Sequence, residues 1–262
     1  MKSTLDQIED IKNNGYFLDF STVFNHAFEN YKKIALYAGL ILLVFSILAF
    51  FLGGGLLVSL YGVQHFNEEF LKNLQNEQTS TSVLAIYSVV IAFFAALFSP
   101  FTAGFLKMAY CADRDEEFKF STVFTYYTSR HFGQLFISTL LISLVSGFIS
   151  VLFNMVGIIL VDTFIALAIT IFTSLAIPLI IFGDLNAIDA IKSSIIIVSK
   201  QPFTIILLLF VAGIGSAIGL IGCCIGVAFT IPITYSVKYA LYSAILNIEE
   251  ENSIDSIGSD SE

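Results

Sequence analysis

Histidine side chains are the first candidates for metal binding or catalysis in this sequence. The chain has three of them, His26, His65 and His131, and a bound transition metal usually needs several imidazole or thiolate ligands. The topology derived below places His26 and His131 on one side of a membrane and His65 on the other. His-Glu-x-x-His, Gly-x-Ser-x-Gly and phosphate-loop motifs are absent from the sequence. We therefore predict no catalytic, metal or cofactor-binding residue, and a protein that is not an enzyme.

Carboxylates could bind a cation at two places. Asp113, Asp115, Glu116 and Glu117 surround Arg114, and we interpret this cluster as a solvated loop, with cation binding as the alternative. Asp162 is the only formal charge between two apolar stretches. An ionisable group at membrane depth usually has a function, but the place of Asp162 at a predicted hairpin tip favours exposure to water.

Tyr235, Tyr239 and Tyr242 recur at helical spacing beside Lys238. Tyrosines near a membrane surface form an interfacial belt, and a neighbouring lysine extends its ammonium group to water. We interpret these residues as such a belt, with ligand stacking as the alternative.

The elements that carry these residues are predicted to be transmembrane helices. Of the 262 residues, 56% are hydrophobic and only 13% are charged, whereas soluble domains carry roughly 25% charged residues. Uncharged stretches long enough to cross a membrane, which takes about 20 residues, predict an all-α polytopic integral membrane protein with six transmembrane helices in three parallel hairpins. The predicted spans lie near residues 36–60, 83–108, 134–156, 162–183, 204–221 and 224–247.

The distribution of basic residues predicts the orientation. Every Lys and Arg except Lys72 falls on one side of the six spans, and basic residues mark the cytoplasmic side. We expect a multi-pass protein of the bacterial cytoplasmic (inner) membrane with both termini in the cytoplasm. The lipid bilayer is the predicted partner, another membrane protein is a further candidate, and no nucleic acid is expected. The net charge of −9 says little about partners, because six of the acidic residues lie in the C-terminal tail.

An internal repeat is the most specific feature of the sequence. The pentapeptide Phe-Ser-Thr-Val-Phe at residues 20–24 recurs at residues 120–124. Ser21 and Ser121 are predicted N-caps, and a third segment that starts at Asp184 or Asn186 has a similar apolar stripe. We predict that each segment is an amphipathic helix on the cytoplasmic membrane surface, with Asn30 off the stripe. The repeated aromatic positions are Phe20, Phe24, Phe120 and Phe124.

Three prolines support the repeat. Pro100, Pro178 and Pro232 each lie six or seven residues before the next charged residue, and proline inside a helix removes a hydrogen bond and bends it. We predict three equivalent kinks, and three repeats around a pseudo-threefold axis along the membrane normal. The predicted organisation is a polar segment (1–16), one membrane domain (17–248) with repeats 17–112, 113–183 and 184–248, and a disordered acidic tail (249–262).

Small residues indicate where helices approach closely. Gly215 and Gly219 lie one helical turn apart, and such pairs allow close helix packing in membranes. Packing within the chain is the favoured interpretation, with dimerisation as the alternative.

Several of these segments resemble a known family. The features are Thr102-Ala103-Gly104, the run Asp-Ala-Ile-Lys-Ser-Ser at 189–194, the run Ser-Lys-Gln-Pro-Phe at 199–203, and the order of the elements. Together they resemble the six-helix membrane domain of the glycerophosphoryl diester phosphodiesterase membrane-domain type and its free-standing uncharacterised bacterial relatives, over about residues 17–248. Those relatives often have a proline-glycine turn between the third and fourth spans, where this chain has Val156-Gly157. The resemblance implies a membrane domain without the phosphodiesterase activity, because we expect no room for a catalytic domain.

Two classes of function remain. The first is a non-enzymatic membrane scaffold or accessory protein that acts on lipid or on a membrane partner. The alternative is a transporter of an uncharged or lipidic substrate along the pseudo-threefold axis. A transporter would need a polar cavity along that axis, whereas a scaffold would fill the axis with side chains.

Overall fold

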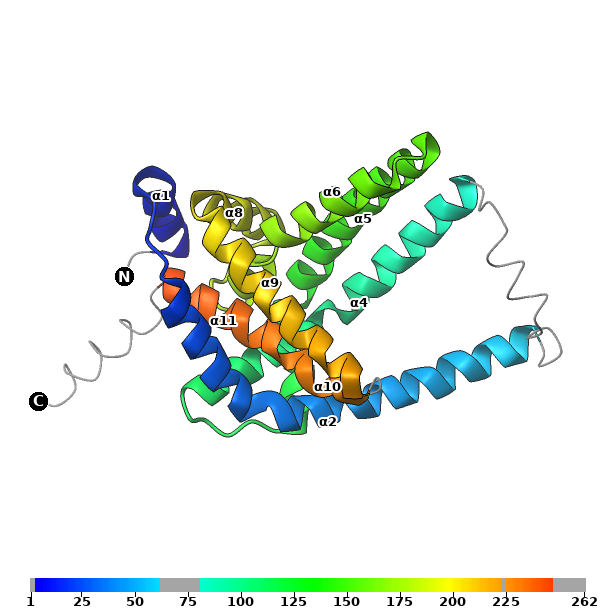
Figure 1. Cartoon of the computed structure of the whole chain (residues 1–262), viewed down its shortest axis with the longest axis horizontal. Coiled ribbons are helices and arrows are strands. Elements are labelled where there is room, and N and C mark those ends of the chain that lie inside the picture. Colours follow the sequence, from blue (N-terminus) through cyan, green and yellow to red (C-terminus); the bar gives the residue numbers. More distant parts are fainter. Residues whose placement is uncertain (1–2, 62–80, 223–224, 247–262) are drawn as a thin grey trace, which may run out of the picture.

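The computed structural model describes residues 3–61, 81–222 and 225–246, and the regular structure of these residues is entirely helical. Figure 1 shows the arrangement. The α-helices are α1 (Thr4–Asn14), α2 (Phe20–Tyr61), α4 (Thr81–Asp113), α5 (Phe132–Val156), α6 (Ile159–Phe172), α7 (Ala176–Ile181), α8 (Ala187–Lys200), α9 (Pro202–Ile218), α10 (Ile225–Thr230) and α11 (Pro232–Leu246), with 3₁₀ helices η2 (Phe120–Tyr127) and η3 (Gly219–Gly222).

Five segments of the described chain are long and apolar enough to cross a membrane, which agrees with an all-α membrane protein. They are Phe20–Leu56, Thr81–Asp113, Phe132–Val156, Leu160–Ile181 and Pro202–Gly222. The predicted sixth span is two shorter helices, α10 with 6 residues and α11 with 15. Their junction at Ile231 precedes Pro232, whose ring and missing N–H interrupt a continuous helix.

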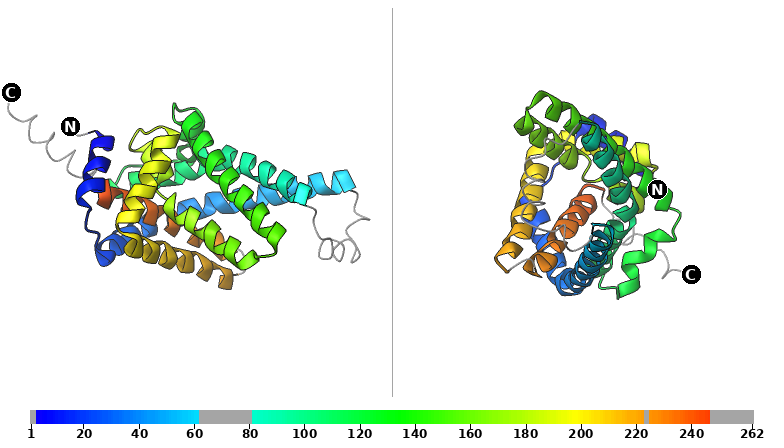
Figure 2. Two further views of the ribbon diagram at one scale, coloured as in Figure 1. Left: turned by 90° about the horizontal axis from the view of Figure 1, so that it is seen from above. Right: turned by 90° about the vertical axis from the view of Figure 1, so that its right-hand side faces the viewer.

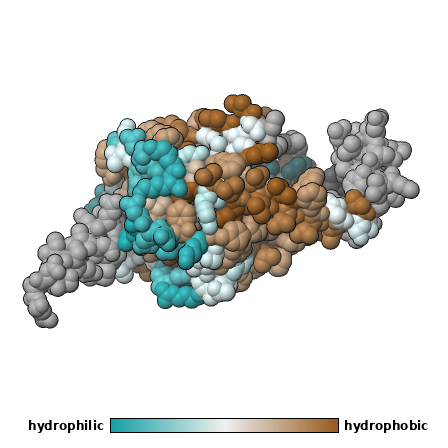
Figure 3. Space-filling view, turned by 90° about the horizontal axis from the view of Figure 1, so that it is seen from below, coloured by the Kyte–Doolittle hydropathy of each residue, from teal (hydrophilic) through white to brown (hydrophobic). Residues whose placement is uncertain are grey.

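Hydrophilic residues gather at one end of the described part of the molecule (Figure 3). Figure 3 shows hydrophilic residues at one end of the visible face and hydrophobic residues over much of the rest. We call the end that holds α1, η2, α8 and the last turns of α4 and α11 the polar end. The opposite end, with the turn between α5 and α6 and the last turns of α2, is called the far end.

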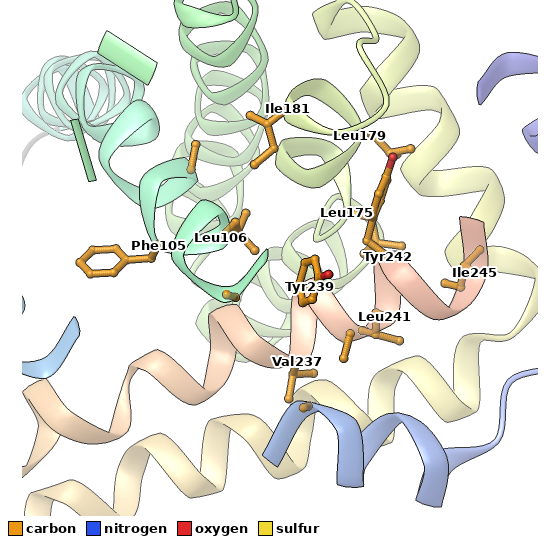
Figure 4. Packing of buried hydrophobic residues seen from close by; sticks show 14 of the residues in the cluster. Phe105, Leu106, Leu175, Leu179, Ile181, Val237, Tyr239, Leu241, Tyr242 and Ile245 are labelled. Atoms are coloured by element: carbon orange, nitrogen blue, oxygen red, sulfur yellow. The ribbon is translucent and has the colours of Figure 1, made fainter. Parts of the chain in front are cut away.

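Helix α11 is the centre of the core. Eleven of its fifteen residues are buried, and it packs against α2, α4, α7 and α9. The right view of Figure 2 shows α11 surrounded by the other helices. In Figure 4, Tyr242 of α11 lies beside Leu175 and Leu179, and Leu106 of α4 faces the same core. The centre of the polar half, around α11, is therefore filled by side chains.

The three predicted kinks differ in local structure. Helix α4 continues through Pro100, and the Ser99 hydroxyl donates to the Ala96 carbonyl at 2.8 Å, the oxygen that the missing proline N–H leaves free. Before Pro178 the chain leaves the helix at residues 173–175. Pro232 is the first residue of α11. Only Pro100 therefore removes a hydrogen bond inside a helix, because Pro178 and Pro232 lie in the first turn of α7 and α11, where the backbone N–H has no partner within the helix.

The break before Pro178 is stabilised by a side chain from another helix. Ser194 of α8 donates its hydroxyl to the Phe172 carbonyl at 2.7 Å and accepts the Leu175 N–H at 3.1 Å. Backbone groups freed inside a membrane protein are commonly paired in this way. The segment that leads into α9 thus stabilises the interrupted helix before it.

The repeated pentapeptide adopts two different conformations. Residues 20–24 form the first turns of the continuous α2, and Asp19 accepts the Thr22 N–H at 2.7 Å. The prediction of Ser21 as N-cap is therefore wrong, because the helix starts one residue earlier. Residues 120–124 form a 3₁₀ helix preceded by Lys119, so Ser121 is not a cap either. Of the two candidates for the third segment, Asn186 is the N-cap, and it accepts the Asp189 N–H at 2.9 Å.

A close approach fixes the position of η2. A Cβ atom on Gly104 of α4 would collide with the backbone of Val123, so glycine at this position lets η2 lie directly on α4. The four repeated phenylalanines also lie in different surroundings. Phe20 stacks on Phe24, while Phe120 and Phe124 gather around Phe45 of α2, with ring centroids 6.4 and 5.7 Å from it.

Candidate functional site

A cluster of polar side chains joins α2, α4 and α11 near the polar end. We call His26, Asn30, Asp113, Ser236 and Tyr239 the polar hub. The Asp113 carboxylate contacts His26 Nε2 at 2.6 Å through Oδ1, and its Oδ2 accepts the Tyr239 hydroxyl at 2.9 Å. One carboxylate therefore holds the first turns of α2 against two other helices.

Asn30 forms the second half of the polar hub. Its Nδ2 donates to the Ala109 carbonyl at 2.6 Å, and its Oδ1 accepts the Ser236 hydroxyl at 2.9 Å. Asn30 is only 2% exposed and Ser236 is fully buried. The prediction that Asn30 lies off the packed face is wrong, because α4 and α11 cover a second face of α2.

Two further interpretations change at the polar hub. Asp113 is the last residue of α4 and is half-buried in these contacts, whereas Asp115, Glu116 and Glu117 are exposed as the solvated-loop interpretation expects. Tyr239 and Tyr242 are 1% and 3% exposed, so the interpretation as an interfacial belt is wrong for both. Protein rather than lipid headgroups covers this face of α11.

The polar hub can hold helices together by hydrogen bonds and can share a proton between His26 and Asp113. It lies among aromatic rings, with Tyr239 edge-on to Tyr110 and Phe182 at centroid distances of 6.2 and 5.9 Å. Across the described residues, no group of three or more His, Cys, Asp or Glu side chains is arranged to hold a metal ion.

A second ionic contact joins the start of α5 to the turn before α8. Asp184 accepts from Arg130 at 2.8 Å and contacts His131 Nε2 at 3.0 Å. Nearby, Gln134 accepts the Ala187 N–H at 2.8 Å. Asp184, which was the alternative cap for the third segment, serves instead as an ion-pair partner at the surface.

A cavity of about 450 Å³ opens between α4, α5 and α6 in the far half of the molecule. We call it the polar groove. Its polar lining residues are Ser88 of α4, Ser143, Ser146, Ser150 and Asn154 of α5, and Thr170 of α6. Apolar residues such as Tyr87 and Ile91 also line it, and they are 58% and 66% exposed. The polar groove therefore opens toward a surface that is otherwise apolar.

Asp162 lies next to the polar groove. The side chain is half-buried in the first turn of α6, and its Oδ1 accepts the Ser150 hydroxyl at 2.7 Å. The carboxylate is thus directed toward α5 and is not fully exposed at the hairpin tip. A second cavity, of about 570 Å³, lies between α5, α6 and α8, and its lining is apolar apart from Thr173.

The predicted packing glycines lie against neighbouring helices of the same chain. A Cβ atom on Gly215 would come within 3.2 Å of Ile233 in α11, and one on Gly219 would collide with Gly226 and Thr230 of α10. The three prolines are all buried. None of these predicted residues lines the polar groove.

Sequence reasoning missed both candidate sites for different reasons. His26 and Asp113 are 87 positions apart, and nothing local links them. By contrast, Ser143, Ser146, Ser150 and Asn154 recur at helical spacing within one apolar span, and this pattern was available in the sequence.

The fold and its apolar surface define an all-helical membrane protein. No protein-family model, curated protein or solved structure matches this chain.

Proposed function

We propose that this protein is a non-enzymatic membrane protein that acts on lipid or on a membrane partner as a scaffold or accessory protein. The observation that carries the proposal is the filled axis around α11. Leu175, Leu179 and Tyr239 are at most 1% exposed there, which supports a scaffold over a central transport path. The two described cavities lie instead beside the α5–α6 pair.

In this proposal the chain crosses a bacterial cytoplasmic membrane six times in three hairpins. The sixth crossing is the interrupted pair α10 and α11, and the polar end faces the cytoplasm. The distribution of Lys and Arg supports this orientation. The three-repeat organisation and membership of the phosphodiesterase-associated membrane-domain family belong to the same proposal, and the repeated pentapeptide and the order of the elements support them.

Cysteine labelling tests the orientation. Single cysteines at Lys12, Lys192 and Val156 are introduced into a parent whose native cysteines are replaced by alanine. A membrane-impermeant thiol reagent added to intact cells should label the cysteine at Val156, at the far end, and leave the other two unmodified until the cells are opened. Labelling of the cysteine at Lys192 from outside would contradict the proposed topology.

Reconstitution tests the functional class. The full chain in liposomes should show neither saturable solute uptake nor lipid scrambling above protein-free vesicles, because the axis around α11 is filled. A variant in which the buried residues Leu106 and Leu179 are both replaced by glycine opens the core and serves as a reference for leakage. Saturable uptake by the native chain would support the transporter alternative instead.

A further inference from the structure

We propose that the polar groove between α4, α5 and α6 binds the primary ammonium headgroup of a membrane lipid, with Asp162 as its anionic partner. This inference rests on the proposed function and names the class of lipid involved. It is carried by the hydrogen-bonding state of the groove, its charge, and the apolar surface onto which it opens.

Four of the polar side chains that line the groove donate a hydrogen bond to the protein itself. Ser88 donates to the Ala85 carbonyl at 2.8 Å, and Thr170 donates to the Ala166 carbonyl at 2.9 Å. Ser150 donates to Asp162, and Asn154 donates to the Ser150 carbonyl at 2.9 Å. A hydroxyl carries one donor and two acceptor lone pairs, so these oxygens remain able to accept. A ligand that carries N–H donors therefore complements these four side chains.

The Asp162 carboxylate beside the groove, bonded to the lining residue Ser150, favours a cation. An ionised carboxylate accepts hydrogen bonds but donates none. The sequence has no Lys or Arg between Arg130 and Lys192, and among the described residues no ion pair involves Asp162. A primary ammonium group supplies both the missing positive charge and three N–H donors. A quaternary ammonium group supplies the charge without the donors.

The opening of the groove identifies the ligand as a lipid. Exposed apolar side chains, including Tyr87 and Ile91, border it on α4, and α4 and α5 belong to segments that can cross a membrane. The polar residues of α5 from Ser143 to Asn154 extend over about 16 Å of helix. A headgroup can therefore lie along this stripe while its acyl chains stay in the hydrocarbon.

Native mass spectrometry of the full chain tests the proposal. The purified protein is mixed with equal amounts of phosphatidylethanolamine, phosphatidylcholine and phosphatidylglycerol that have identical acyl chains. We expect phosphatidylethanolamine to be retained about tenfold over phosphatidylcholine, because only its primary ammonium group can donate charge-assisted hydrogen bonds. Asp162→Asn keeps an acceptor for Ser150 but removes the charge, and it should lower phosphatidylethanolamine retention about tenfold.

Matched variants separate the groove from general lipid binding. Ser146→Leu fills the groove and should lower phosphatidylethanolamine retention about tenfold. Ser46→Leu makes the same change at an exposed position of α2 and should leave retention unchanged. Thermal unfolding of each variant checks the fold, and if Ser146→Leu does not fold, Asp162→Asn decides the result alone.

Several outcomes would overturn the proposal. Equal retention of the three lipids by the native chain would do so, as would unchanged phosphatidylethanolamine retention in Asp162→Asn. Free ethanolamine in millimolar excess should not displace the lipid, and full displacement would identify a soluble amine site instead. The liposome assay is independent: solute uptake would refute the scaffold proposal, while loss of lipid preference alone would leave it standing.

Discussion

Around α11 near the polar end, side chains are buried in contacts between helices, whereas the far half of α2 exposes every residue from Ser46 to Leu52. Both regions are apolar in sequence. They differ because four helices converge on α11, while α2 continues past its neighbours. A helix that is hydrophobic on all sides requires either a protein core or lipid around it. Protein packing therefore stabilises the first region, and lipid solvates the second.

A charge placed in the polar hub should cause the largest loss of stability. Asn30→Glu removes the contacts to Ala109 and Ser236 and buries a carboxylate. We expect a loss of about 3–5 kcal/mol in the free energy of unfolding, the cost of an uncompensated buried charge. Reversible unfolding in mixed micelles measures it. Asn25→Glu, at an exposed position of the same helix, should have little effect, and equal losses in the two variants would disprove the burial of Asn30.

Truncating one leucine in each region tests the comparison directly. Leu179 is fully buried, and Leu52 is 73% exposed. Leu179→Ala should cost about 2–5 kcal/mol, the usual range for a core cavity. Leu52→Ala should be nearly neutral in a bilayer, because lipid tails are as apolar as the leucine they contact. A steric-trapping measurement in bilayers compares the two. A large loss for Leu52→Ala would indicate that a protein partner covers the far half of α2.

Removing the side chain that supports the break between α6 and α7 should have a smaller effect on the free energy of unfolding. Ser194→Ala leaves the Phe172 carbonyl and the Leu175 N–H without their partner, and unpaired buried polar groups cost about 1–3 kcal/mol. The hydroxyl of Ser199, on the same helix, donates to the Ile195 carbonyl of that helix and not to another element. Its replacement by alanine is the control, and equal stability of both variants would show that the break needs no support from α8.

The sequence predicted the parts of this fold that depend on local pattern. Apolar length and composition located the first five spans, because a membrane requires uninterrupted helices. Local pattern did not reveal that a new helix begins at Pro232, nor that the repeated pentapeptide forms an α-helix in one copy and a 3₁₀ helix in the other. The conformation of the second copy depends on a neighbour distant in the sequence, because Gly104 of α4 lets η2 lie directly on that helix at Val123. The polar hub was inaccessible for the same reason, since Asn30 becomes buried only when α4 and α11 both pack against α2.

The smallest expected effect lies at the water-exposed start of α2. Asp19 caps the helix, and hydrogen bonds from the Thr22 N–H and hydroxyl lower the pKa of its carboxyl below the ordinary value. A lowered pKa in the folded state means that the ionised form stabilises the fold. This contribution is complete above the unfolded pKa and is lost as the pH falls through the folded one. Asp19→Asn keeps a capping oxygen but does not titrate, so between about pH 5 and pH 3 the native chain should lose slightly more stability than the variant. Thermal unfolding at a series of pH values measures the difference, and parallel curves would show that this cap makes no pH-dependent contribution.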